Sequence, residues 1–114
     1  MAVACANRWD RWRIARGLIA QARDGADGSP IILVGHSGGG RDAIFIARSL
    51  APRAVAVDGL ICLDTAWADP VPANVRRAVH LYLTRRRVYP ARPLTYEPAA
   101  GREPANIDLN AALT

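Results

Sequence analysis

The stretch Ile31-Ile32-Leu33-Val34-Gly35-His36-Ser37-Gly38-Gly39 decides the fold of this chain. Its first four residues are apolar, which is typical of a strand buried on both faces of a parallel sheet. A glycine-rich turn with one serine follows, and a helical pattern opens near Arg41. A strand, a sharp turn and a helix in that order hold a serine hydroxyl clear of neighbouring side chains. The stretch therefore predicts that Ser37 is a nucleophile.

The three glycines around Ser37 have expected roles in this turn. We expect Gly35 and Gly39 to adopt backbone angles that other residues avoid, and to let the strand and the helix pack closely. The backbone N–H of Gly38 directly follows the serine, where it can help to stabilise a developing oxyanion. The turn is thus predicted to supply a nucleophile and one oxyanion donor.

The length and composition suit a single domain over residues 1–114. The chain has 114 residues, of which 51% are hydrophobic, so it can bury a core. Its formal net charge is +5, and the positive charge is carried by arginine because the sequence contains no lysine. The arginines are scattered and lack an aromatic stacking platform, so we expect no nucleic-acid partner.

The remaining composition signals concern redox state, location and cofactors. Cys5 and Cys62 are too few for a disulfide scaffold. The apolar N-terminal residues 2–6 are too short for the core of a signal peptide, and no apolar stretch reaches transmembrane length. We therefore expect a cytoplasmic chain with a buried thiol at Cys62, no membrane span, no metal and no cofactor.

The residues before and after the turn predict two main helices. An amphipathic helix is expected over residues 8–24, where a turn-forming cluster that runs to Pro30 ends it. The helix after Ser37 is expected to stop at Pro52. A second apolar run then leads into Asp64, so residues 31–64 read as strand, helix and strand joined by a right-handed crossover.

Residues 65–114 read as a loop-rich C-terminal part. Residues 78–84 fit both a helical spacing and a strand-like alternation, and we favour a strand because an open sheet needs another parallel member. A short strand is also possible near residues 94–96. The sequence therefore predicts an α/β fold with a parallel sheet of about three to four strands, flanked by two main helices.

The segment from Ile31 to Asp64 resembles the α/β-hydrolase superfamily, specifically its lipase, esterase and thioesterase branch. The matching residues are the stretch Ile31–Gly39 and the stretch Gly59-Leu60-Ile61-Cys62-Leu63-Asp64. The family has several strands upstream of its nucleophile, which the first 30 residues cannot supply. The resemblance therefore implies an incomplete α/β-hydrolase sheet and a partial chain.

The resemblance also implies a Ser–His–acid mechanism acting on a small-molecule carboxylic ester or thioester. Ser37 would be the nucleophile and Gly38 would give one oxyanion donor. Asp64 is the first candidate for the acid, because in this family the acid follows the nucleophile at the carboxyl end of a later strand. Asp69 and Glu97 are fallback candidates.

The histidine of this mechanism has two candidate sources. His80 is the only histidine after Asp64, so it is a candidate base, with a partly buried structural role as the alternative. His36 precedes the serine, as is common in the family, where it shapes the elbow with its side chain directed away from the serine proton. If His80 is structural, the true base is expected beyond Thr114.

Two other functions compete with hydrolysis. A nucleotide-binding module would use the Gly35–Gly40 turn and Asp58 as a ribose ligand, but Ser37 and Arg41 occupy positions where the dinucleotide fingerprint needs glycine. A non-catalytic remnant of a hydrolase would keep the turn for packing and act as an interaction domain. Such a unit could associate with itself through exposed sheet edges. Trp67, which follows Asp64, could line an acyl pocket or cover the sheet.

Overall fold

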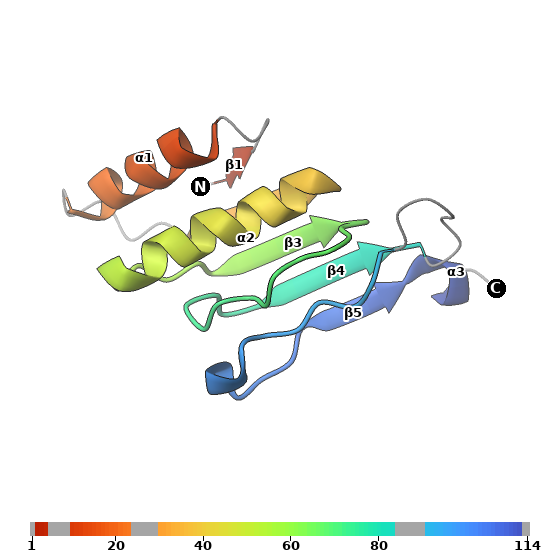
Figure 1. Cartoon of the computed structure of the whole chain (residues 1–114). Coiled ribbons are helices and arrows are strands. Elements are labelled where there is room, and N and C mark those ends of the chain that lie inside the picture. The colour runs from red at the N-terminus through yellow and green to blue at the C-terminus, as the bar shows by residue number, and fades with distance from the viewer. Residues whose placement is uncertain (1, 5–9, 24–29, 84–90, 113–114) are drawn as a thin grey trace.

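The structure is a computed structural model that describes residues 2–4, 10–23, 30–83 and 91–112. Its elements are, in chain order, β1 (Ala2–Ala4), α1 (Arg11–Arg23), β2 (Ile32–His36), α2 (Gly38–Leu50), the 3-10 turn η1 (Ala51–Arg53), β3 (Gly59–Leu63), β4 (Ala78–Tyr82), the 3-10 turn η2 (Pro98–Ala100), β5 (Ala105–Asp108) and α3 (Leu109–Ala112). The described strands form one five-stranded sheet in the order β1-β2-β3-β4-β5 (Figure 1). Every pair of neighbouring strands is parallel.

This architecture confirms the α/β class and the two main helices. Of the helix expected over residues 8–24, residues 11–23 form α1 and Asp10 is a turn residue, while residues 8, 9 and 24 lie outside the described residues. The second helix ends at Leu50, and η1 with its proline follows, as Pro52 predicted. The strand favoured over residues 78–84 is present as β4, with residue 84 outside the described part.

The two edge strands, β1 and β5, were not predicted. β1 is only three residues long and pairs with β2 from Ala2 opposite Ile32. β5 pairs with β4 from Val79 opposite Ala105. The short strand considered near residues 94–96 is instead a single bridge between Val71 and Tyr96.

The sheet is covered on one face. Leu33 on β2 and Leu60 on β3 are 1% and 0% exposed, whereas Val34 at the alternate position of β2 is 37% exposed. Val34 lies in register with Ile61 and Val79, so apolar side chains cross three strands on this second face. Both main helices lie over the other face (Figure 1). The expectation that residues 31–34 are buried on both faces is therefore wrong for Val34, because neither α1 nor α2 reaches its side.

Helix α2 packs its apolar side against the covered face of the sheet. Its buried apolar residues recur at spacings of three and four, which places them on one side of the helix; they are Ala43, Ile44, Ile46, Ala47 and Leu50. Burying each of the larger side chains contributes about 1.5–3 kcal/mol. Cys62 of β3 belongs to the same core and is fully buried as a free thiol, as expected.

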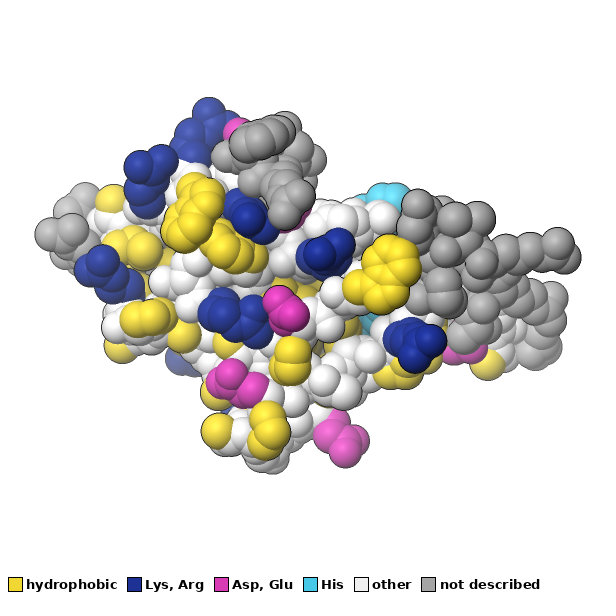
Figure 2. Space-filling model, viewed as in Figure 1, with side chains coloured by type: hydrophobic (Ala, Val, Ile, Leu, Met, Phe, Trp, Pro, Cys, Tyr) yellow, Lys and Arg dark blue, Asp and Glu magenta, His cyan; other side chains and the backbone are white. Residues whose placement is uncertain are grey.

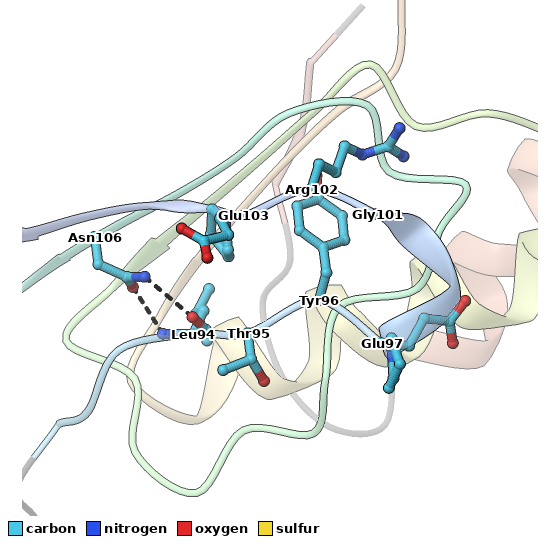
Figure 3. Close-up of a pocket in the computed structure, with 10 residues that line it drawn as sticks. Leu94, Thr95, Tyr96, Glu97, Gly101, Arg102, Glu103 and Asn106 are labelled. Carbon is cyan, nitrogen blue, oxygen red and sulfur yellow. Dashed lines mark hydrogen bonds between the residues drawn. The ribbon is translucent and has the colours of Figure 1, made fainter.

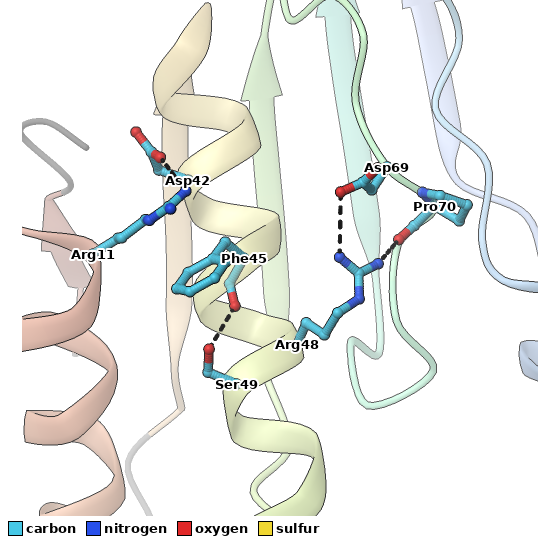
Figure 4. A network of polar contacts seen from close by, with 7 residues as sticks. All are labelled: Arg11, Asp42, Phe45, Arg48, Ser49, Asp69 and Pro70. Atoms are coloured by element: carbon cyan, nitrogen blue, oxygen red, sulfur yellow. Dashed lines mark hydrogen bonds and ion pairs between the residues drawn. The ribbon is translucent and has the colours of Figure 1, made fainter. Parts of the chain in front are cut away.

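Two arginines tie α2 to its neighbours (Figure 4). Arg11 of α1 lies 3.5 Å from a carboxylate oxygen of Asp42 and 4.1 Å from the centre of the Phe45 ring. Arg48, near the end of α2, pairs with Asp69 at 3.7 Å in the loop between β3 and β4. These contacts fix α2 between α1 and that loop, and they engage Asp69 away from the turn at Ser37.

Charged side chains are spread over the face of the molecule that carries the helices. Figure 2 shows arginines along this face with apolar and acidic side chains between them, rather than one basic patch in this view. In the part of the chain that the structure describes, no helix is long and apolar enough to cross a membrane.

The closest approach between β2 and α2 occurs at Gly35. A Cβ atom added at Gly35 would lie 2.2 Å from the backbone oxygen of Gly39. The obstacle is helix backbone, which cannot rotate away as a side chain can. Any side chain at position 35 would therefore push the helix off the strand.

We predict that Gly35→Ala lowers the free energy of unfolding by about 2 kcal/mol or more, because the new methyl group overlaps helix backbone. Gly39→Ala is the matched control, since an added Cβ at Gly39 meets nothing within 4 Å. Alanine also favours a helix by up to about 1 kcal/mol over glycine. Urea unfolding of both variants measures the difference. Equal stabilities of the two variants would contradict the close approach.

Candidate active site

Ser37 occupies a strained backbone conformation at the junction of β2 and α2. Its φ is 55° and its ψ is −121°, a region that residues with a side chain rarely adopt and that costs about 1–3 kcal/mol. The side chain is exposed and makes no capping hydrogen bond to α2. A strained, exposed hydroxyl that does no capping is available for chemistry.

Hydrogen bonds hold the Ser37 backbone from both sides. Its N–H donates to the carbonyl of Leu63 at 2.8 Å, and its carbonyl accepts from the Gly40 N–H at 3.0 Å. The hydroxyl of Thr65 donates to the same carbonyl at 3.1 Å. The turn is therefore fastened to α2 and to the carboxyl end of β3.

The structure corrects the roles expected for the glycines. Neither Gly35 nor Gly39 has a positive φ; Ser37 itself takes the left-handed conformation. Gly35 is needed for close packing, as expected, but a Cβ at Gly39 would meet open space. The expectation that both glycines adopt unusual backbone angles is therefore wrong. The strand and the helix do pack closely here, because the Gly39 backbone is what a side chain at position 35 would meet.

Gly38 is the first residue of α2, and it is exposed. The first N–H groups of a helix have no partner within the helix, and the positive end of the helix dipole lies there. The Gly38 N–H therefore lies where an anion beside Ser37 would be stabilised, which supports its expected role as an oxyanion donor.

Asp64 lies at the same edge of the sheet as Ser37. Strand register places His36 opposite Leu63 and Leu63 opposite Leu81, so Ser37 and Asp64 follow neighbouring strand ends. The Asp64 N–H donates to the Leu81 carbonyl at 2.7 Å. One Asp64 carboxylate oxygen accepts a hydrogen bond from the Leu83 N–H at 3.3 Å. Asp64 thus has the position expected of the acid, while its carboxylate also binds the backbone after β4.

The two fallback acids lie elsewhere. Asp69 pairs with Arg48 of α2. Glu97 precedes η2, near the amino ends of the strands (Figure 1), and its carboxylate accepts the Ala73 N–H at 2.8 Å. The structure therefore brings neither of them to Ser37.

His80 is fully buried on β4 and is engaged by the backbone. Its Nε2 accepts a hydrogen bond from the Thr65 N–H at 2.9 Å, and its ring stacks on Tyr82 with 4.9 Å between ring centres. Its Nδ1 is buried without a hydrogen bond among the described residues. His80 is 0% exposed, and its Nε2 already accepts a hydrogen bond. These observations favour a structural role for His80 over the role of catalytic base.

Burial lowers the pKa of His80, and the nearby backbone of Arg92 and the Asp64 carboxylate oppose this shift only in part. Protonation would place an Nε2–H against the Thr65 N–H, so two donors would face each other. The fold therefore requires neutral His80. Burial also raises the pKa of Cys62 to about 12, so that thiol stays protonated.

His36 lies on the other face of the sheet. Successive residues of a strand point to opposite faces, and Gly35 faces α2, so exposed His36 faces away from α2. Within this sequence the two imidazoles are those of His36 and His80, and neither is arranged to accept the Ser37 proton.

Asp58, the ribose ligand of the nucleotide-binding alternative, precedes β3 at the amino edge of the sheet. It accepts the Ile31 N–H at 2.8 Å and pairs with Arg76 at 3.3 Å. Ligands of open parallel sheets bind at the carboxyl edge, so the position of Asp58 argues against a dinucleotide site.

One pocket lies near the amino end of β5 (Figure 3). Its polar groups bond the chain itself: Asn106 exchanges hydrogen bonds with the Leu94 backbone, and Arg102 donates to the Val75 carbonyl at 2.7 Å. The Arg102 guanidinium also lies 5.0 Å from the centre of the Tyr96 ring. These side chains serve the loop before β5, so this pocket is a poor candidate site.

A second pocket, of about 360 Å³, lies just beyond the carboxyl end of β3. Its lining residues are Thr65, Trp67, Ala68, Arg92 and Pro93. Thr65 connects it to the turn through the hydrogen bond to the Ser37 carbonyl. The sequence suggests Trp67 for such a pocket but not Thr65 or Arg92, because nothing in the local pattern marks either of those two residues.

No protein-family model, curated protein or solved structure matches this chain. The resemblance to α/β-hydrolases therefore stays a prediction.

We predict that acid destabilises the protein through His80. Because the folded-state pKa of His80 is lowered from 6.5, the unfolded chain binds more protons as the pH falls below that value. The contribution of neutral His80 is complete above about pH 6.5 and is lost toward lower pH. Urea unfolding at about pH 7.5 and about pH 5.5 measures the loss. His80→Gln, whose amide oxygen can accept the Thr65 N–H, should reduce this pH dependence.

His36→Gln is the control for this experiment, because His36 is exposed. It should leave the pH dependence of stability unchanged. If His36→Gln rather than His80→Gln flattened the pH dependence, the assignment of the buried neutral imidazole would be wrong.

Proposed function

We propose that this chain carries the nucleophile of a serine hydrolase that acts on carboxylic esters or thioesters. The observation that carries the proposal is the conformation of Ser37, strained at φ 55° and exposed between β2 and α2. Stability alone gives no reason to keep a serine in that conformation, since the strain lowers stability. The need for a nucleophile to project toward a substrate does give a reason for this conformation.

In the proposed reaction the Ser37 oxygen attacks the acyl carbonyl and its proton passes to a base. The carbonyl oxygen becomes an oxyanion next to the Gly38 N–H, and collapse of this intermediate expels the alcohol or thiol. Water then releases the acyl group from Ser37. Asp64, at the neighbouring strand end, is the proposed acid that orients the base.

The base in this proposal is an imidazole other than His36 and His80. His80 supports Thr65 through its Nε2, and His36 lies on the far face of the sheet. The resemblance to α/β-hydrolases implies a histidine that follows the last strand of the sheet, which here corresponds to the region after β5. We therefore propose that these residues form part of a larger catalytic unit.

The second candidate is a hydrolase-like unit without catalysis that serves as an interaction domain. Two observations favour it: the engagement of His80 by the backbone, and the apolar face at Val34, Ile61 and Val79 that neither main helix covers. Exposed apolar patches often mark interaction surfaces. This candidate predicts an unreactive Ser37 in a folded protein.

We predict that a fluorophosphonate probe labels Ser37, and that adding imidazole to the buffer speeds the labelling. The probe reacts with an activated serine, and free imidazole can take the proton that neither chain histidine is placed to accept. The position of the label is read by mass spectrometry of peptides. Ser37→Ala should abolish it.

Ser49 provides the internal control for labelling. Its hydroxyl donates to the Phe45 carbonyl at 2.9 Å within α2, so it should stay unlabelled. Absence of a label on Ser37 in folded protein, with and without imidazole, would overturn the hydrolase proposal and support the interaction domain.

A further inference from the structure

The pocket lined by Thr65, Trp67 and Arg92 combines an apolar wall with a cation. Trp67 and Pro93 supply apolar surface, and Arg92 supplies the charge. Its volume of about 360 Å³ is near the lower end of the usual range for ligand pockets, about 300–1,000 Å³. Such a pocket suits a fragment of about the size of one ring with a short polar tail.

Trp67 has an exposed side chain and a strained backbone. Its side chain is 63% exposed, although a tryptophan gains most from burial. Its φ is 53°, a conformation that strains any residue with a side chain. Strained residues in loops cluster at ligand-binding sites, so Trp67 points to a ligand on the carboxyl edge of the sheet.

Arg92 is exposed and also lines this pocket. Among the described residues its guanidinium takes part in none of the ion pairs, which join Arg11, Arg13, Arg48 and Arg76 to aspartates. A guanidinium binds carboxylates and phosphates through paired hydrogen bonds. The charge of Arg92 thus selects an anion.

We propose that this pocket binds a carboxylate-bearing substrate, with the apolar or aromatic part of the molecule against Trp67 and the carboxylate on Arg92. This inference rests on the proposed function for its meaning, since it names the ester or thioester as one that carries a free carboxylate. Thr65 lines the pocket and also donates its hydroxyl to the Ser37 carbonyl, so one residue joins the pocket to the turn that carries the proposed nucleophile. A net charge of +5 favours the approach of an anionic substrate.

Binding of phenylacetate tests the proposal without requiring catalysis. Phenylacetate carries a ring and a carboxylate, and phenylacetamide is its neutral counterpart of nearly the same shape. Titrations followed by NMR should move the signals of the Trp67 indole N–H and the Arg92 N–H groups. We expect phenylacetate to bind about ten-fold more tightly than phenylacetamide, as one partly exposed ion pair allows.

Variants of Arg92 separate charge from folding. Arg92→Gln should weaken phenylacetate binding about ten-fold and leave phenylacetamide unchanged, whereas Arg92→Lys should keep most of the affinity. Arg53→Gln is the matched control, because Arg53 is equally exposed but lies in η1, after the far end of α2. Equal binding of the two ligands, equal effects of the two glutamine variants, or signals that move away from Trp67 would overturn the proposal.

Ligand binding and the labelling of Ser37, taken together, distinguish this inference from the hydrolase proposal. If phenylacetate binds as expected but Ser37 takes no fluorophosphonate label, the pocket stands and the hydrolase proposal fails. If Ser37 is labelled but phenylacetate and phenylacetamide bind equally, the hydrolase proposal stands and the carboxylate preference is wrong.

Discussion

The close approach of α2 to β2 at Gly35 is the constraint on which the site depends. Because Gly35 has no side chain, the backbone of Gly39 can approach it closely. Its carbonyl oxygen lies only 2.2 Å from the point that a Cβ at position 35 would occupy. The chain must then reverse from strand to helix within one residue, and Ser37 takes up the strain at φ 55°. Thr65 fits against Gly40 for the same reason, since a Cβ at Gly40 would lie 2.0 Å from its hydroxyl. The missing side chain at Gly35 thus permits the tight turn. The missing side chain at Gly40 leaves room for Thr65, whose hydroxyl donates to the Ser37 carbonyl.

The sequence predicted the middle of the fold and missed its edges, for a physical reason. β2 and α2 follow from a local apolar run and a helical period, because each carries enough large apolar residues to show its pattern. Residues 78–84 fit a helical and a strand-like spacing alike, and β4 was favoured there because an open sheet needs another parallel member. β1 and β5 show no such pattern. Ala2–Ala4 and Ala105–Asp108 contain few large apolar side chains, and they become strands by pairing with β2 and β4. The sequence also could not predict that the helices cover only one face of the sheet, because an apolar run does not indicate on which face a helix will pack.

The candidate site divides in the same way. Ser37 was predictable because strand, turn and helix are consecutive in sequence, and Asp64 because parallel strands end at a common edge. The strand favoured over residues 78–84 placed His80 within an element but did not identify its partner. The partner decides the role of His80, because an Nε2 that accepts the Thr65 N–H supports a loop. Arg92 could not be found at all, since it reaches the pocket from a loop that carries no pattern. Unusual backbone angles were assigned to glycines because glycine tolerates them, yet Ser37 carries the strain itself.

Thr65 joins the parts of the site that otherwise belong to separate elements. Its N–H donates to His80, its hydroxyl donates to the Ser37 carbonyl, and its side chain lines the pocket with Trp67 and Arg92. Neutral His80 is required for the first of these bonds, because a protonated Nε2 would meet a second donor. The buried imidazole therefore contributes to the site without touching the serine: it holds Thr65, and Thr65 holds the turn. For this reason a fully buried histidine can matter to the proposed chemistry even though it does not accept the serine proton.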